Sequence, residues 1–325
     1  MEDPSGFSWL NDSPPYQRPG LLMNRHLESI IPSVFRKVDL PAPKEGIAEL
    51  PDGDFLEFDH YGSGSKHLVI LCHGLEGNSR KAYMLGMAKA MLQAGFDVVA
   101  WNYRCCGKLL NRTERLYHSG ATDDLEAIID RFAPGYVQTR LVGFSLGGNL
   151  ILKYLGEQPH RSTIISGAVT FSVPADLKHA SFKLAKTSNL IYSRYFLSGM
   201  KKKMKLKSES IPSLKRFSLQ GIRSILEFDE RITAPLNGYS SAMEYYKVNS
   251  CLNVLDQITT PTLVINAKND PFLTPGCSPT ETYALHPFIR FLTPGHGGHV
   301  GFYQSGDRYW SEAVTVQFFN STGTK

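Results

Sequence analysis

The chain has 325 residues, of which 42% are hydrophobic and 20% charged, and its net charge is +5. This length suits one large α/β domain or two smaller ones, with enough apolar residues to bury a sizeable core. The mild charge and the lack of any DNA- or RNA-binding signature argue against a nucleic-acid partner.

The first forty residues are expected to be largely irregular, because four prolines between positions 14 and 32 break any long element. Within them, residues 24–30 predict a short helix that Asn24 caps. Two strands follow, at residues 47–50 and 55–58. The Asp52-Gly53 dipeptide between these strands is a hairpin turn signal.

From residue 67 onward, apolar strands alternate with helical patterns. The run from His67 to Cys72 is continuously apolar, as in a strand that is buried on both faces of a parallel sheet. The alternation predicts an α/β fold with a doubly wound, mostly parallel sheet. Further strands are expected at residues 98–101, 140–144, 166–171, 262–266 and 289–292, and helices at about 84–91, 125–132, 146–155 and 307–319.

One interval departs from this alternation. Residues 172–261 separate two predicted strands, whereas an ordinary crossover needs only about a dozen residues. We therefore expect a single domain spanning residues 1–325, in which residues 175–255 form an inserted helical cap over the carboxyl edge of the sheet. Residues 180–204 have a helical pattern, and the lysine-rich run 201–207 is interpreted as a solvated helix end, with weak membrane-surface association as the alternative.

The cysteines and the amino-terminal residues indicate the cellular compartment of the protein. The five cysteines are odd in number and follow neither a C-x-x-C nor a disulfide-framework spacing. The chain starts without a basic and apolar leader, and no apolar run reaches the roughly 18 residues of a membrane span. We expect a soluble, cytoplasmic protein with reduced thiols and no cleaved signal peptide.

Residues 143–147 read Gly-Phe-Ser-Leu-Gly, which is the G-x-S-x-G nucleophile elbow. In this motif a serine sits on a strained turn between a strand and a helix, and its hydroxyl points away from the backbone. The predicted strand precedes the motif and the predicted helix follows it. Side chains at Gly143 or Gly147 would crowd the turn. Ser145 is therefore the predicted nucleophile.

A serine hydroxyl needs a histidine to take its proton and a carboxylate to orient that histidine. Asp270 follows the strand at 262–266, and His296 and His299 follow the last strand, which is the chain order usual for this elbow. Taken alone, such residues are more often turn, cap or ordinary surface residues, but their joint occurrence at strand ends favours catalysis. Both histidines stay open as the base, and Asp229 in the insert is the second candidate acid.

Two backbone N–H groups are expected to stabilise the oxyanion of a tetrahedral intermediate. They belong to Leu146, at the start of a helix, and to Leu75, in the loop after the strand at 67–72. Metal binding is the rival use of Asp270, His296 and His299, but no zinc-ligand spacing accompanies them. No metal or other cofactor is expected.

Segments along nearly the whole chain follow the pattern of one family. They are Asn24-Arg25-His26-Leu27, Ile31-Pro32, residues 50–54, His73-Gly74-Leu75-Glu76-Gly77, Asn111-Arg112, residues 117–120, residues 143–149, Glu227-Phe228-Asp229, residues 232–234, Asn269-Asp270-Pro271-Phe272 and residues 297–302. In these segments the chain resembles the α/β-hydrolase superfamily and, within it, the YheT-like branch, also called the AB hydrolase 4 family. The resemblance implies that His299, not His296, is the catalytic base.

One segment departs from the family pattern. The family commonly has an Arg-Gly-Cys-Ser-Gly turn where this chain has Arg104-Cys105-Cys106-Gly107-Lys108, so the local backbone is expected to differ there. The adjacent thiols are interpreted as inert, because a vicinal disulfide is strained.

The resemblance implies a serine hydrolase that cleaves carboxylic esters with short or medium acyl chains, or lipid esters. Two alternatives stay open: an acyltransferase to an alcohol that uses the same triad, and a non-catalytic ligand-binding protein, against which a complete triad argues. The sequence does not indicate an oligomeric state. Apolar residues of the insert predict an acyl pocket above Ser145, lined by Leu184, Leu190, Ile191, Tyr192, Tyr195, Phe196 and Leu197.

Overall fold

An eight-stranded sheet lies at the centre of the protein, in the order β1-β2-β4-β3-β5-β6-β7-β8. The structure is a computed structural model and describes residues 16–20, 24–62 and 64–322. Strands β3 to β8 run parallel to one another, whereas β1 and β2 pair antiparallel with their neighbours. The strands are β1 (Lys44–Glu49), β2 (Phe55–Tyr61), β3 (His67–Cys72), β4 (Asp97–Asn102), β5 (Gln138–Phe144), β6 (Ile165–Phe171), β7 (Thr262–Ile265) and β8 (Ile289–Leu292).

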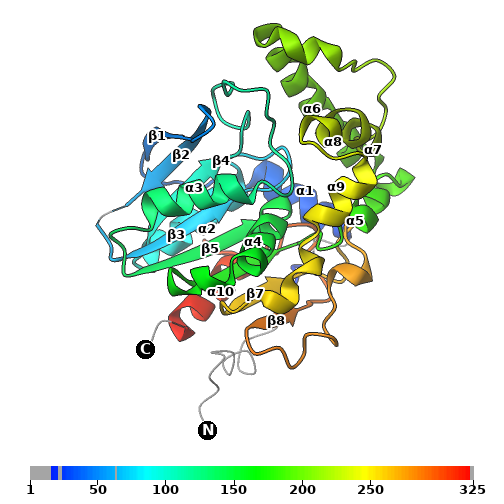
Figure 1. Ribbon diagram of the computed structural model, residues 1–325. Coiled ribbons are helices and arrows are strands. Elements are labelled where there is room, and N and C mark those ends of the chain that lie inside the picture. The colour runs from blue at the N-terminus through cyan, green and yellow to red at the C-terminus, as the bar shows by residue number, and fades with distance from the viewer. Residues whose placement is uncertain (1–15, 21–23, 63, 323–325) are drawn as a thin grey trace.

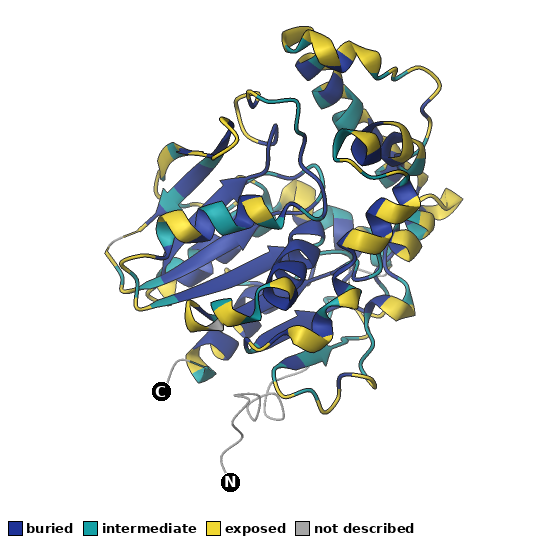
Figure 2. Cartoon of the chain, viewed as in Figure 1, coloured by how far each residue is buried: buried dark blue, intermediate teal, exposed yellow. Residues whose placement is uncertain are grey.

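Helices cover both faces of the sheet, which explains why its parallel strands are apolar throughout. In β3, Leu68 and Ile70 pack in one core with α3 and α4, whereas Val69 and Leu71 pack in the other core with α2 and α10. Figure 2 shows the central strands buried and the outer helix faces exposed. The predicted doubly wound, mostly parallel sheet is confirmed (Figure 1). These helices are α2 (Ala82–Gln93), α3 (Thr122–Phe132), α4 (Leu146–Glu157) and α10 (Trp310–Ser321).

The predicted hairpin forms between β1 and β2. The Leu50 N–H donates to the Asp54 carbonyl oxygen at 2.8 Å and closes the turn, in which Gly53 has a φ of 80°. A positive φ at this position explains the Asp-Gly signal, because glycine adopts it without a steric penalty.

The amino-terminal helix α1 (Arg25–Phe35) is longer than the sequence predicts. The Asn24 side chain accepts the His26 and Leu27 N–H groups, as expected of a cap. Pro32 lies inside the helix, so the expectation that it would break a long element is wrong. Pro32 is buried, and tertiary packing outweighs the one helical hydrogen bond that proline removes. The irregular start expected over residues 1–15 and 21–23 falls outside the described residues.

Five α-helices lie between β6 and β7, and α6, α7 and α8 extend beyond the sheet (Figure 1). The single helical pattern predicted at 180–204 is interrupted around residues 185–189 and continues as α6. No helix in the described residues is long and apolar enough to cross a membrane. The helices are α5 (Leu177–Leu184), α6 (Leu190–Ser210), α7 (Ile225–Phe228), α8 (Ala234–Leu236) and α9 (Ala242–Asn249).

The lysine run on α6 is directed largely into the protein, so its interpretation as a solvated helix end is wrong for three of its lysines. Lys203 Nζ donates to Glu76 Oε1 at 2.6 Å, and the fully buried Lys207 donates to Asn111 Oδ1 at 3.0 Å. Lys201 donates to a backbone carbonyl of the insert. These contacts remove much of the basic surface on which a membrane-binding role for the run depended.

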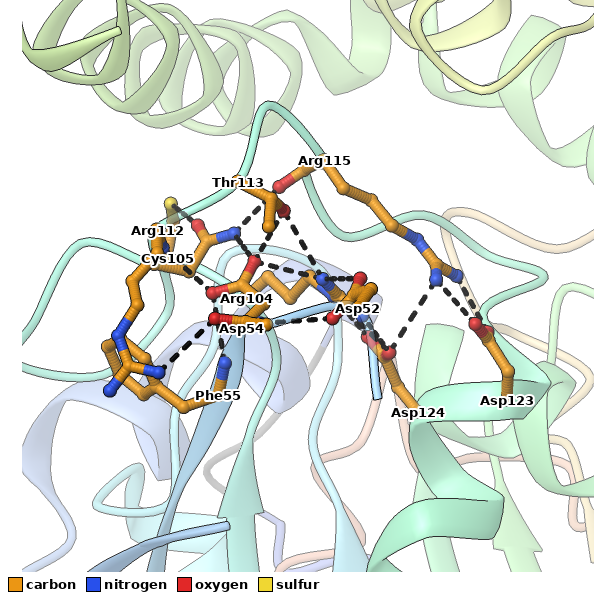
Figure 3. Close-up of polar contacts among 12 residues, drawn as sticks. Asp52, Asp54, Phe55, Arg104, Cys105, Arg112, Thr113, Arg115, Asp123 and Asp124 are labelled. Carbon is orange, nitrogen blue, oxygen red and sulfur yellow. Dashed lines mark hydrogen bonds and ion pairs between the residues drawn. The ribbon is translucent and has the colours of Figure 1, made fainter. Parts of the chain in front are cut away.

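The loop between β4 and α3 is anchored by the buried guanidinium of Arg104 (Figure 3). Arg104 lies 2.6 Å from Asp52, 2.9 Å from Asp54 and 2.7 Å from Asp124, and so joins the hairpin turn to α3. Next to it, Cys105 has a φ of 61°, a left-handed conformation that glycine adopts most easily. The backbone therefore keeps a conformation that suits the glycine usual at this position, and the expectation of a local difference is not met there. Both adjacent cysteines are buried free thiols.

Candidate active site

Ser145 occupies the sharp turn between β5 and α4. Its φ and ψ are 54° and −118°, a conformation that residues other than glycine rarely adopt. A Cβ added at Gly143 would lie 2.5 Å from the Gly147 carbonyl oxygen, and one added at Gly147 would lie 2.4 Å from the Cys72 carbonyl oxygen. Both elbow glycines are therefore required by the close approach of backbone segments.

Ser145, His299 and Asp270 form one hydrogen-bonded chain. His299 Nε2 lies 2.9 Å from Ser145 Oγ, and His299 Nδ1 lies 2.8 Å from Asp270 Oδ2. The Phe272 N–H donates to the other oxygen of the Asp270 carboxyl at 2.8 Å. Because an ionised carboxylate only accepts, the network assigns the proton to Nδ1 and leaves Nε2 free to accept the serine hydroxyl.

The other two candidate residues lie outside this chain. His296 is half exposed, and its Nδ1 lies 3.7 Å from Glu28 Oε1. Asp229 is buried and accepts a hydrogen bond from Tyr246 at 2.6 Å. Within the described ranges, no group of three or more His, Cys, Asp or Glu side chains is arranged to hold a metal ion.

The loop after β3 crosses directly over the elbow. A Cβ added at Gly74 would lie 3.2 Å from the Ser145 Cβ, and the Gly74 N–H already donates to the Tyr83 hydroxyl at 3.0 Å. The N–H groups of Leu75 and Leu146 have no hydrogen-bond partner in the described part of the chain. Both are therefore available to a ligand beside Ser145, and both residues line the cavity there.

The side chain of His73 is hydrogen-bonded to this loop. Its Nε2 accepts the Tyr103 N–H at 3.2 Å, so its Nδ1 carries the proton and donates to the Gly74 carbonyl oxygen at 2.8 Å. Complete burial lowers the pKa of His73 to about 3, which keeps the imidazole neutral. The sequence marked this residue only as part of a weak His-Gly signal, and the hydrogen bonds show its structural role.

Helix α1 supports both loops that carry Asp270 and His299, a role that the sequence did not reveal. Glu28 Oε2 accepts the Gly297 N–H at 2.7 Å and the Asn269 side-chain amide at 2.8 Å. Ser29 Oγ accepts the His299 N–H at 2.8 Å. The available signal was that Glu28 and Ser29 directly follow the amino-terminal segment that resembles the family.

A cavity of about 560 Å³ opens above Ser145. Five of the seven apolar residues predicted for an acyl pocket line it: Leu184, Ile191, Tyr192, Tyr195 and Phe196. Leu190 and Leu197 are not among its lining residues, and Leu197 packs instead in the core of the insert.

Comparisons with known proteins agree with this architecture. The α/β hydrolase fold family matches residues 67–305. The chain is 33% identical over 288 residues to the putative esterase YheT of Escherichia coli, with 86% of this chain and 84% of that protein covered. It is 28% identical over 279 residues to the medium-chain fatty acid ethyl ester synthase/esterase 2 of Saccharomyces cerevisiae, covering 78% of this chain but only 61% of that protein.

Among solved structures, the Pyrococcus furiosus esterase Pf2001 superimposes with a TM-score of 0.56 at 18% identity, covering 88% of this chain and 97% of that one. At this identity the likeness supports the fold alone. Together with the family match and the sequence relatives, it leads to one conclusion. The chain belongs to the α/β-hydrolase family and, within it, to the branch that contains YheT.

Proposed function

We propose that the protein is a serine hydrolase that cleaves carboxylic esters through an acyl-enzyme on Ser145. The observation that carries this proposal is the continuous hydrogen-bonded chain from Ser145 through His299 to Asp270. The relatives named as esterases act on the same class of bond. The cavity above the serine supplies space for a substrate.

In the first half-reaction, Ser145 Oγ forms a bond to the ester carbonyl carbon while its proton passes to His299 Nε2. The carbonyl oxygen becomes negatively charged and accepts hydrogen bonds from the N–H groups of Leu75 and Leu146. The intermediate then collapses, the bond to the alcohol oxygen breaks, and His299 gives its proton to the leaving alcohol. Asp270 keeps the imidazole oriented and stabilises its positive charge.

In the second half-reaction, water attacks the acyl-enzyme and gives its proton to His299. The bond between the acyl carbon and Ser145 Oγ then breaks, the serine takes the proton back, and the carboxylic acid leaves. Each proton taken up by the histidine is therefore returned within the cycle.

The segment at residues 175–255 is proposed to act as a cap within a single domain. Its helices contribute Leu184, Ile191, Tyr192 and Phe196 to the cavity wall. An apolar wall favours an acyl chain, since each buried methylene group contributes roughly 0.8 kcal/mol of transfer free energy. The proposed substrates are therefore esters of short or medium-chain fatty acids, or lipid esters.

Replacing the nucleophile tests the proposal. Ser145→Ala removes the attacking oxygen and should lower kcat on a chromogenic octanoate ester by on the order of 10⁴-fold or more, because the triad acts as a unit. The variant should keep the circular dichroism spectrum and thermal transition of the wild type. Substantial turnover by a folded Ser145→Ala protein would refute the proposal.

Acyl transfer to an alcohol is the second candidate, and one observation favours it: a relative at 28% identity is named as both a synthase and an esterase. The same acyl-enzyme would then be attacked by an alcohol in place of water. Measuring the ratio of new ester to free acid at increasing ethanol concentration separates the two activities.

A further inference from the structure

The cavity above Ser145 contains a polar cluster, which we call the Asp229 cluster and define as Ser181, Asp229, Thr233 and Tyr246. All four residues line the cavity. Asp229 is only 6% exposed and accepts hydrogen bonds from Thr233 Oγ1 at 2.7 Å and from the Tyr246 hydroxyl at 2.6 Å. Ser181 Oγ lies 3.0 Å from the Tyr246 hydroxyl.

The direction of these hydrogen bonds shows what the cluster can still bind. Tyr246 has one hydroxyl proton and donates it to Asp229, so Ser181 is the donor to Tyr246. The hydroxyl protons of Ser181, Tyr246 and Thr233 are therefore already in use. The groups that stay free are acceptors, namely the remaining lone pairs of the Asp229 carboxylate and of the Ser181, Thr233 and Tyr246 oxygens.

The carboxylate of Asp229 also has no ion-pair partner among the described residues. Three other buried carboxylates, those of Asp54, Asp124 and Glu76, each lie within 3 Å of an arginine or lysine nitrogen. A buried charge without a partner of opposite charge is costly to the fold. An asparagine would have a similar shape at this position without that cost. The negative charge of Asp229 is therefore expected to have a function.

The backbone at this position is unusual as well. Asp229–Thr233 forms a π-helical turn between α7 and α8. Such turns are rare and occur frequently at functional sites. Three separate elements thus meet in the cluster, because Ser181 comes from α5 and Tyr246 from α9.

We propose that the Asp229 cluster binds a hydroxyl group of the ester substrate and thereby selects hydroxylated esters. The inference rests on the proposed ester hydrolysis and adds a binding site for the substrate. A hydroxyl has one proton to donate, which a single carboxylate oxygen satisfies. An ammonium group of the ester is the other ligand that these acceptors could take, and a choline ester tests it. The hydroxyl belongs either to the alcohol part of the ester or to the acyl chain, and the two sources are separable by experiment.

Matched ester pairs test the proposal in the full-length protein. The first pair is 2-hydroxyethyl octanoate against propyl octanoate, which places a hydroxyl or a methyl group at the same position of the alcohol. The second pair is propyl 8-hydroxyoctanoate against propyl nonanoate, which does the same at the end of the acyl chain. The wild type should favour the hydroxylated member of one pair by about 10- to 100-fold in kcat/KM, since a hydrogen bond to a buried charged group is at stake.

Asp229→Asn should reduce that preference to within about threefold of unity, because the charged acceptor is lost. A purely structural role would lower kcat/KM on both members equally and leave their ratio unchanged. Asp256→Asn, a change at an exposed aspartate one residue beyond the insert, is the matched control and should keep the wild-type ratio.

The possible results separate a failure of the proposed ester hydrolysis from a failure of the proposed hydroxyl site. If the wild type hydrolyses none of these esters, the proposed function fails. If it hydrolyses them but prefers the hydroxyl in neither pair, the hydroxyl site is refuted whatever the variants do. A preference that persists in Asp229→Asn, or a stronger preference for the choline ester of octanoic acid than for the 2-hydroxyethyl ester, also overturns it.

Discussion

His299 and His296 lie three residues apart, yet their surroundings differ completely. His299 contacts both Ser145 and Asp270, whereas His296 is half exposed and faces Glu28. We predict that His299→Ala lowers kcat by on the order of 10⁴-fold, because the serine loses its base. His296→Ala is the matched control and should stay within about threefold of wild type. Steady-state kinetics on one ester checks both, and a reversed pattern would transfer the role of base to His296.

Asp229 affects stability through its ionisation. Burial raises the pKa of its carboxyl from 3.8 to about 6, although the hydrogen bonds from Tyr246 and Thr233 act in the opposite direction. At pH values between 3.8 and 6, the folded chain keeps a proton that the unfolded chain has lost. The stabilising contribution of that proton is therefore lost as the pH rises through 6.

It follows that Asp229→Asn should become more stable relative to wild type as the pH rises. The difference in the free energy of unfolding should grow by about 1 to 2 kcal/mol between pH 5 and pH 8, from a shift of roughly two pH units. Urea denaturation of both proteins at the two pH values measures this change. A difference that does not vary with pH would mean that the carboxyl titrates normally.

Among the single residues of the candidate site, those in short local motifs were predictable from the sequence. Ser145 follows from the elbow, and Asp270 and His299 follow from chain order together with the family resemblance. Glu28 was not predictable, because its hydrogen bond to Gly297 spans 269 positions and leaves no local pattern. The positive φ of Cys105 was also hidden, since a cysteine rarely adopts that conformation.

Helix α6 is tied to the loop that carries Leu75 by the ion pair between Lys203 and Glu76. Tyr117 also donates its hydroxyl proton to Glu76 Oε1 at 2.6 Å, and Glu76 has a strained φ of 54°. Burial opposes a charged lysine, but Cys106 and Glu76 outweigh burial and raise the pKa of Lys203. The lysine therefore stays charged and positions the loop.

We predict that Lys203→Met lowers kcat by at least about tenfold with a smaller effect on KM, because a loop shift of about 1 Å misplaces the oxyanion donor. It should also destabilise the fold by about 3 kcal/mol, since it leaves Glu76 buried and unpaired. Lys203→Arg should restore most of kcat, and the exposed Lys202→Met should match wild type. Equal losses in Lys203→Met and Lys202→Met would contradict a positioning role.

Element boundaries were less predictable than element types. Helix α1 continues past Pro32, because packing outweighs local propensity there. The break around residues 185–189 is stabilised by Asn189, whose side-chain amide donates to the Lys183 and Pro271 carbonyl oxygens. A contact to Pro271 across 82 positions is invisible to helical periodicity. The inward lysines of α6 likewise depend on loops that are distant in sequence.

At the scale of the whole molecule, the cavity above Ser145 is the proposed substrate site. The volume of this cavity is about 560 Å³, so a sufficiently long acyl chain would exceed it. We predict that kcat/KM for propyl esters rises with acyl length and falls once the chain exceeds the cavity. Each added methylene should increase kcat/KM by up to about fourfold while it is buried. A flat or steadily falling profile from butanoate to palmitate would reject the apolar acyl pocket.

The strand and helix order could be read from the sequence because each strand buried on both faces leaves an unbroken apolar run. The shape of the cavity could not, since it depends on where α5, α6 and α7 lie relative to the sheet. Of the seven apolar residues expected to line it, Leu197 packs inside the insert and Leu190 is not among the lining residues. The periodicity of a helix gives its faces, and the tertiary packing decides which face meets the cavity.

The most direct test of an acyl-enzyme on Ser145 is to label the active serine. A fluorophosphonate probe reacts with a serine only where a neighbouring base activates it, and peptide mass mapping locates the adduct. We predict a single adduct on the peptide that contains Ser145, absent from Ser145→Ala and strongly reduced in His299→Ala. An adduct on any other serine, or no adduct in a preparation that hydrolyses esters, would contradict the acyl-enzyme on Ser145.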